Sequence, residues 1–208
     1  MVAKLNRMQV QRKLKHLGLG VFTPREFQGI FNVPKKTALT FISRNVKSGL
    51  FLKLRNNYYQ LQDNYVSAYT IANKIYQPSY VSLETALSYY GIIPETIYAV
   101  TSITTKSTKE FETPKTVFIY RKIKLRGFTG YRATRLEGVV VLFAEAEKAL
   151  ADYLYFVDLK KIALNDRLEL RNINRTKLVK YVKLFNRSSL LKLVDHIYAE
   201  YRKPQRIY

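Results

Sequence analysis

The sequence contains no cysteine, no tryptophan and few glycines. Without cysteine there can be no disulfide, no thiolate nucleophile and no cysteine-ligated zinc. The eight glycines form neither a GxGxxG nor a GxxxxGK[ST] phosphate-binding loop. No run of eighteen uncharged apolar residues and no signal-peptide pattern occurs. These absences predict a cytoplasmic protein that does not use a membrane as a partner.

Histidine is also scarce, with His16 and His196 at opposite ends of the chain. Neither has neighbours that suggest a metal pair or a Ser-His-Asp arrangement. Three acids near one another, Glu145, Glu147 and Asp152, are the remaining candidate for chemistry. On a helix, Glu145 and Asp152 share a face, while Glu147 points about 200° away. We interpret them as acids that complement the dipole at a helix N-terminus, and we expect no special geometry between Glu147 and Lys148. The sequence therefore predicts no catalytic residue, no metal and no cofactor.

Acidic residues are outnumbered by basic ones, with 15 Asp and Glu against 36 Lys and Arg, which gives a net charge of +21. The imbalance is concentrated near the N-terminus. Residues 1–62 hold twelve Lys and Arg against the single acid Glu26, while residues 63–208 hold twenty-four against fourteen. A third of the chain therefore carries half of the excess. This distribution favours a polyanion such as nucleic acid as the partner of the N-terminal part.

The segment Phe22–Leu61 has the pattern of a helix-turn-helix. Thr23 is a good N-cap and Pro24 suits the first helical position. After a short helix and turn, Pro34 is expected to begin a second helix, which Gly49 ends. Apolar residues recur along this second helix at the spacing of a buried stripe, namely Leu39, Ile42 and Val46.

A β-hairpin is expected directly after these helices. Residues 50–54 and 58–61 are apolar or aromatic, and they flank the turn Arg55-Asn56-Asn57. An additional basic, amphipathic helix is expected within residues 1–17, with Leu5, Met8 and Leu14 on one side. Together these elements predict a winged helix-turn-helix domain over residues 1–62.

The outer face of the second helix carries residue types that contact phosphates and base edges in a major groove. With the wing, the predicted DNA-binding residues are Lys35, Lys36, Thr37, Thr40, Ser43, Arg44, Lys47, Arg55 and Asn56. The predicted partner is double-stranded DNA with operator repeats. No coiled-coil heptad is present, so we expect a monomer or a dimer formed on DNA. The alternative interpretation is a solvated basic face on a small helical domain.

Residues 63–208 are expected to form an α+β domain ending in helices. Helices are predicted over 78–91, 144–156, 175–185 and 188–201, and strands over 96–105, 116–123 and 138–143. Ser82 is the expected cap of the first of these helices. The polar segment 106–114 is expected to be a loop or the end of a strand.

The order of these features resembles the antitoxins of the abortive-infection (AbiE) phage-defence systems, a type IV toxin–antitoxin family of transcriptional regulators. The resemblance spans about Phe22 to Phe156. The residues that carry it are Ser79-Tyr80, Ala86-Leu87 and Gly91, followed by Glu147-Lys148-Ala149-Leu150 and Asp152. It implies that the N-terminal domain represses its own operon, and that the second domain counteracts a nucleotidyltransferase-like toxin, with or without direct contact. The resemblance assigns no role to Glu147, Lys148 or Asp152.

Other functions fit parts of the sequence. The charge and the seventeen tyrosines also suit a general RNA- or ribosome-associated protein, because tyrosines stack on bases. A nuclease or nucleotidyltransferase is less compatible, because the Gly-Ser and paired-aspartate pattern of nucleotidyltransferases is missing. A winged helix that binds protein instead of DNA is disfavoured by its basic face.

Overall fold

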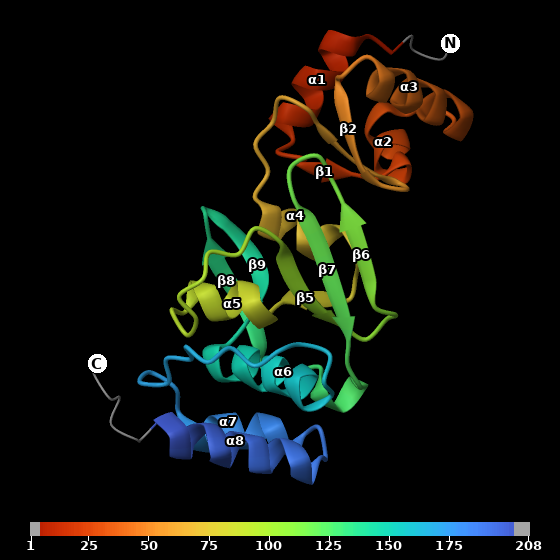
Figure 1. The fold of residues 1–208 in the computed structure, drawn as a ribbon. Helices are drawn as coiled ribbons and strands as arrows, with labels where there is room; N and C mark the ends of the chain where they lie inside the picture. Colours follow the sequence, from red (N-terminus) through yellow and green to blue (C-terminus); the bar gives the residue numbers. More distant parts are fainter. Residues whose placement is uncertain (1–4, 202–208) are drawn as a thin grey trace.

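The computed structural model describes residues 5–201 of the chain. It confirms the α+β class, with eight α-helices and two β-sheets in the described part (Figure 1). The N-terminal helices and the small sheet lie at one end of the molecule. The large sheet occupies the middle, and the last two helices form the opposite end (Figure 1).

The N-terminal unit combines three helices with a three-stranded antiparallel sheet of order β1-β3-β2. Its elements are α1 (Arg7–His16), β1 (Val21–Phe22), α2 (Pro24–Phe31), α3 (Lys35–Lys47), β2 (Phe51–Arg55) and β3 (Tyr58–Leu61). The core is largely aromatic, with the rings of Phe22, Phe27 and Phe51 fully or almost fully buried. Phe22 and Phe51 meet edge to face, with their ring centroids 5.1 Å apart, an arrangement that the ring quadrupoles favour.

Short-range signals in this unit are confirmed. The Thr23 hydroxyl accepts from the Glu26 N–H, and the Glu26 carboxylate accepts from the Thr23 N–H, which completes a capping box at α2. Gly49 has a φ of +74° just beyond α3, a conformation that glycine adopts without strain. Pro34 is the N-cap of α3 and not its first helical residue.

The predicted buried stripe of α3 is wrong by part of a turn. Its buried residues are Ala38, Ile42 and Asn45, whereas Leu39 is 39% exposed. Asn45 was overlooked because it is polar, yet its side-chain amide donates to the Phe41 carbonyl at 2.8 Å, which satisfies that donor beside the core. In α1 the buried residues are Val10 and Leu14, and the predicted Met8 points to solvent.

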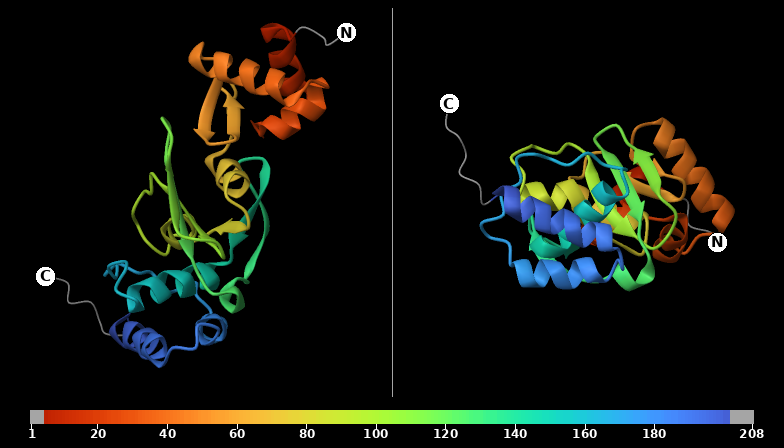
Figure 2. Two further views of the ribbon diagram at one scale, coloured as in Figure 1. Left: turned by 90° about the vertical axis from the view of Figure 1, so that its right-hand side faces the viewer. Right: turned by 60° about the horizontal axis from the view of Figure 1, so that its bottom comes forward.

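The second unit is built on a six-stranded mixed sheet of order β6-β7-β5-β4-β9-β8. Its strands are β4 (Ser79–Val81), β5 (Val100–Thr104), β6 (Lys109–Glu112), β7 (Val117–Lys122), β8 (Tyr131–Leu136) and β9 (Val139–Ala144). The β4–β9 and β5–β7 pairs are parallel, and the others are antiparallel. The sheet curves so that its two ends flank helix α4 (Ala68–Ile75), as the left view of Figure 2 shows.

Four further helices complete this unit: α5 (Leu83–Tyr89), α6 (Ala146–Asp158), α7 (Arg175–Lys183) and α8 (Ser188–Tyr201). Helix α6 packs between α5 and the α7–α8 pair, and a short 3₁₀ helix, η1 (Leu125–Gly127), precedes β8. The helices predicted over 144–156, 175–185 and 188–201 are thus confirmed, as are the three predicted strands. The second of those helices ends slightly earlier than predicted.

Two predicted elements are wrong. The segment 78–91 is not one helix, because its first part is strand β4 and only 83–89 is helical. Strand β4 is fully buried and lies between β5 and β9, so sheet pairing decides the conformation of this short apolar run. The segment 106–114, expected to be a loop or the end of a strand, contains a separate edge strand, β6, whose exposed charged side chains are typical of a protected sheet edge.

The two units contact each other through both polar and apolar groups. The Arg55 guanidinium donates to the Ile75 carbonyl at 2.6 Å and lies over the rings of Tyr58 and Phe111. Lys74 pairs with Glu26 at 2.6 Å. Two apolar residues of the N-terminal sheet, Val21 and Leu54, also belong to the core of the second unit. The domain boundary at residue 62 stays a prediction.

Candidate functional site

The outer face of α3 is the first candidate site. Six of its seven predicted contact residues are exposed, and Thr37 is half-buried. The exposed ones are Lys35, Lys36, Thr40, Ser43, Arg44 and Lys47. The structure therefore leaves six of the seven polar residues that the sequence singled out on this helix open to solvent.

This exposure follows from the way α3 packs. Ala38 and Ile42 face α2 and the small sheet, so the positions around Lys36, Thr40 and Lys47 lie on the opposite side of the helix. Their spacing of four and seven residues keeps them in one row along the helix. Helix α1 also contacts the C-terminal end of α3, where the Arg7 guanidinium donates to the Ser48 carbonyl at 3.3 Å.

The cations of this face are free of counter-ions. Among residues 5–201, no ion pair involves Lys35, Lys36, Arg44 or Lys47. Other basic residues of the unit are occupied: Lys15 pairs with Asp63 at 2.9 Å, and Lys13 donates to the Ile30 carbonyl at 2.7 Å. The outer face of α3 therefore presents a group of cations that no acid of the described residues neutralises.

The hairpin contributes less than predicted. Arg55 is the last residue of β2 and is turned toward the second unit, where its guanidinium is held by Ile75, Tyr58 and Phe111. The predicted contact of Arg55 with DNA stays a prediction, and in this structure the side chain is held at the second unit. Asn56 is exposed at the turn. Lys53 is exposed on the same strand and was missed, although strand alternation from the buried Leu54 would have placed it outward.

A second polar cluster lies in the core of the second unit. Lys148 and Asp152 form an ion pair one turn apart on α6, and both side chains are completely buried. The Asp152 carboxylate also accepts from the hydroxyls of Tyr80 and Ser82, at 3.0 and 2.9 Å. The Lys148 ammonium lies 5.0 Å from the centre of the Phe185 ring. The expectation that Lys148 has no special geometry is wrong.

Burial perturbs the ionisation of this cluster. Loss of water raises the pKa of Asp152 and lowers the pKa of Lys148, because a charge is less stable away from solvent. The pKa of Tyr80 is raised well above its ordinary value, mainly by burial and then by the Asp152 charge, so Tyr80 remains a hydrogen-bond donor. Each charge in the cluster is therefore stable only while its partner is present.

Two acids at the start of α6, Glu145 and Glu147, bind α7. The Lys177 ammonium is 3.1 Å from a carboxylate oxygen of both Glu145 and Glu147. The expected separation of these two acids is wrong because Glu145 is the extended N-cap of the helix and does not follow helical geometry. The Tyr181 hydroxyl donates to Glu145 at 2.6 Å and, with Lys177, lowers the pKa of that carboxyl. These contacts attach α7 to the start of α6.

Within residues 5–201, no group of three or more His, Cys, Asp or Glu side chains is placed to hold a metal ion. In the same range, no helix has both the length and the apolar character that crossing a bilayer requires. In comparisons with known proteins, no family model matches the chain and no curated protein is significantly similar to it.

Proposed function

We propose that this chain is a cytoplasmic DNA-binding regulator whose N-terminal unit is a winged helix, with α3 as the recognition helix. The second unit is the effector of an antitoxin, and it opposes a nucleotidyltransferase-like toxin. The observation that carries the DNA-binding part is the free outer face of α3. It combines four cations that have no ion-pair partner within residues 5–201 with the exposed hydroxyls of Thr40 and Ser43.

The arrangement of α3 supports insertion into a major groove. A single helix fits this groove, and Arg and Lys bind guanine edges and phosphates there. Lys35 and Lys36 lie at the N-terminal end of α3, which is the end that contacts base edges in helix-turn-helix proteins. Helix α2 and the small sheet pack behind α3 and leave its outer side open.

The experiment measures binding to a duplex from the region upstream of the gene for this chain, with a scrambled duplex of equal length as reference. We expect protection of a short inverted repeat by the wild-type protein. Lys36→Ala with Arg44→Ala should weaken specific binding, by about 1–3 kcal/mol for each base contact that is lost. The salt dependence should also decrease, by about 0.9 log unit per log unit of salt for each lost phosphate contact.

The matched control is Lys180→Ala with Lys183→Ala. These lysines are exposed on α7 and their loss removes the same charge at the opposite end of the molecule (Figure 1). Equal weakening by both double variants, or tighter binding to single-stranded RNA than to the duplex, would favour a general nucleic-acid binder and reject the operator-reading role.

The antitoxin part of the proposal draws on the residues that carry the family resemblance. Tyr80 from β4 and Lys148 with Asp152 from α6 meet in one buried cluster, so residues 72 positions apart maintain a shared core. This clustering gives these residues a structural role, and it leaves recognition of the toxin to the surface around them.

The test of this part is growth under induction of the nucleotidyltransferase-like gene expected beside this one. The full chain should restore growth. The Lys36→Ala, Arg44→Ala variant should restore it equally, because the second unit is unchanged in that variant. Failure of the wild-type chain to rescue, or the absence of such a neighbouring gene, contradicts the antitoxin role. If only the variant failed to restore growth, protection against the toxin would have to come from repression through α3.

A further inference from the structure

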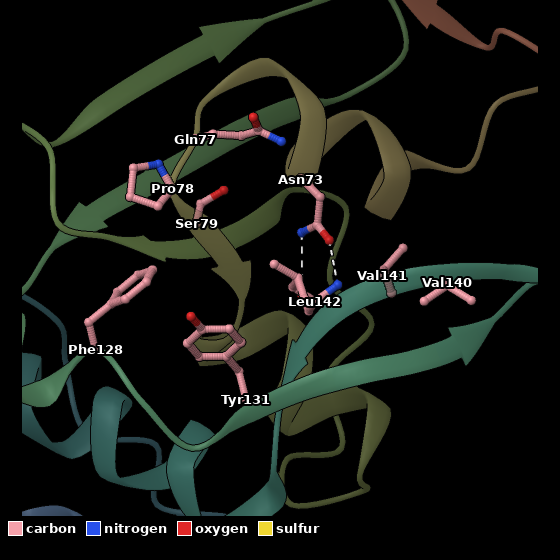
Figure 3. A pocket seen from close by; sticks show the side chains of 9 residues that line it. All are labelled: Asn73, Gln77, Pro78, Ser79, Phe128, Tyr131, Val140, Val141 and Leu142. Atoms are coloured by element: carbon pink, nitrogen blue, oxygen red, sulfur yellow. Dashed lines mark hydrogen bonds between the residues drawn. The ribbon is translucent and has the colours of Figure 1, made fainter.

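A pocket of about 540 Å³ opens in the second unit between β4, β9 and the end of α4. Figure 3 shows its lining: Phe128 and Tyr131 on one side, Val140 and Leu142 on another, and Ser79 between Pro78 and Asn73. Its size falls in the range of about 300–1,000 Å³ that is typical of small-molecule sites. None of its lining residues belongs to the α3 face or to the buried ion pair.

The pocket exists because two neighbouring strands separate. Strands β4 and β9 are paired only at Val81 and Phe143, and beyond this point the gap between them is not closed by strand pairing. There the side chain of Asn73 makes the backbone hydrogen bonds that a paired strand would otherwise make. It donates to the Leu142 carbonyl at 3.3 Å and accepts from the Leu142 N–H. The β9 edge is therefore satisfied at Leu142 and held away from β4.

One wall of the pocket is aromatic and fixed in position. The rings of Phe128 and Tyr131 lie 5.3 Å apart, and Tyr131 is stacked on the buried ring of Tyr80 at 4.4 Å. Opposite them, Val140 and Leu142 are 68% and 39% exposed. Apolar side chains of this size at the rim of a hollow leave surface that a ligand would cover.

Two polar side chains of the pocket, Ser79 and Gln77, make no hydrogen bond within residues 5–201, whereas the amide of Asn73 is bonded to Leu142. The Ser79 side chain is 3% exposed, and its hydroxyl has no hydrogen-bond partner among the described residues. A buried hydroxyl normally has a partner, as Ser82 has in Asp152. The amide of Gln77, at the same side of the pocket, also makes no hydrogen bond within residues 5–201 and is exposed. Both groups can donate and accept.

The lining restricts the chemistry of a ligand. No charged side chain lines the pocket, although the chain carries a net charge of +21, so it offers no counter-ion to a phosphate or carboxylate. A purely apolar ligand would leave the Ser79 hydroxyl without a partner. Flat aromatic walls together with groups that donate and accept suit a flat, uncharged ring with a hydrogen-bonding edge.

We propose that this pocket is a binding site for an uncharged nitrogen heterocycle of the nucleobase or nucleoside class. The ring lies against Tyr131 and Phe128, and its polar edge meets the Ser79 hydroxyl and the Gln77 amide. Val140 and Leu142 cover the opposite side. This site is separate from the proposed DNA-binding surface, so nucleoside binding can be measured without a duplex.

The test is calorimetric titration of the full chain with adenosine and with uridine, in the absence of DNA. At least one nucleoside should bind saturably with one site per chain. Ser79→Ala should weaken that binding about three- to tenfold, as expected for a lost hydrogen bond. Val140→Trp should abolish it by filling the pocket from an exposed position. Leu164→Trp is the matched control, because Leu164 is also exposed but does not line the pocket, and it should bind as the wild type does.

Three results would overturn the proposal. One is the absence of saturable binding by either nucleoside at millimolar concentration. Another is binding that persists unchanged in both Ser79→Ala and Val140→Trp. The third is much tighter binding of adenosine 5′-monophosphate or of toluene, since these would require a cationic or a purely apolar site. A failure of operator binding leaves all three measurements interpretable, so the two proposals fail separately.

Discussion

Replacement of Asp152 by asparagine isolates the charge of the buried ion pair. The new amide side chain would have almost the same shape and would still present an oxygen to the Tyr80 and Ser82 hydroxyls, which now donate to the carboxylate. The variant leaves the Lys148 ammonium fully buried with no counter-ion. Breaking a buried pair in this way typically costs about 3–5 kcal/mol.

Deprotonation of Lys148 sets an upper limit on this loss of stability. In the folded variant, Lys148 can avoid being an unpaired charge by losing its proton. For a lysine with an ordinary pKa of 10.5, neutralisation costs about 1.4 kcal/mol per pH unit, or about 5 kcal/mol at pH 7. In the variant the unfolded chain then binds one more proton than the folded chain between the lowered pKa of Lys148 and 10.5. Its stability must therefore rise with pH, by up to about 1.4 kcal/mol per unit.

The assay is urea unfolding at pH 7, 8 and 9, followed by far-UV circular dichroism and by tyrosine fluorescence, since the chain has no tryptophan. Adding Lys148→Met should recover most of the loss, because it removes the unpaired charge. The control is Asp195→Asn, which breaks the exposed pair with Arg175 and should cost about 0–1 kcal/mol. A decrease of less than about 1 kcal/mol in the free energy of unfolding for Asp152→Asn, with no dependence on pH, would refute the conclusion that this ion pair is shielded from water.

Two further predictions concern the contacts around α6 and α7. The pKa of Glu145 is lowered in the folded state, so this carboxylate contributes stability above its ordinary pKa of 4.5 that is lost as pH falls through the folded pKa. Glu145→Gln should therefore flatten the acid limb of a curve of stability against pH, and an acid limb unchanged from that of the wild type would contradict this. Gly130→Ala should lower the free energy of unfolding by more than about 2 kcal/mol, because Gly130 has a φ of +74° and a Cβ there would lie 2.6 Å from the Tyr181 ring. Gly138→Ala measures the cost of the positive φ alone, because Gly138 has a φ of +77° and no atom lies near its Cβ position. An equal decrease in the free energy of unfolding for both variants would contradict the predicted clash with Tyr181.

Sequence reasoning succeeded where a few adjacent residues decide the conformation. The cap at Thr23, the stop at Gly49 and the turn before Tyr58 are local signals, and the structure has all three. Long periodic segments such as α6 were also predictable, because their pattern repeats over several turns. The exposed face of α3 followed from the same periodicity, even though the phase of its buried face was misjudged.

The failures arose where distant segments decide the structure. Strand β4 is a strand because β5 and β9 lie on either side of it, and nothing within residues 79–81 contains that information. Lys148 and Asp152 are four residues apart, which in a sequence is the pattern of an ordinary surface ion pair. The packing of distant residues against α6, among them Phe185 and Tyr80, turns that pair into a buried one. Arg55 similarly resembles a wing residue until Phe111 is placed beside it.

Helix α4 ends in a turn that both halves of the molecule use. On one side, Lys74 pairs with Glu26 of the α2 capping box, and the Ile75 carbonyl accepts from Arg55. On the other side, Asn73 holds β9 and lines the pocket. Because these residues are adjacent in one helix, a shift of this turn would change the contacts on both sides together. Any difference in nucleoside affinity between the free and the DNA-bound protein must then equal the effect of the nucleoside on DNA affinity, since such coupling is reciprocal.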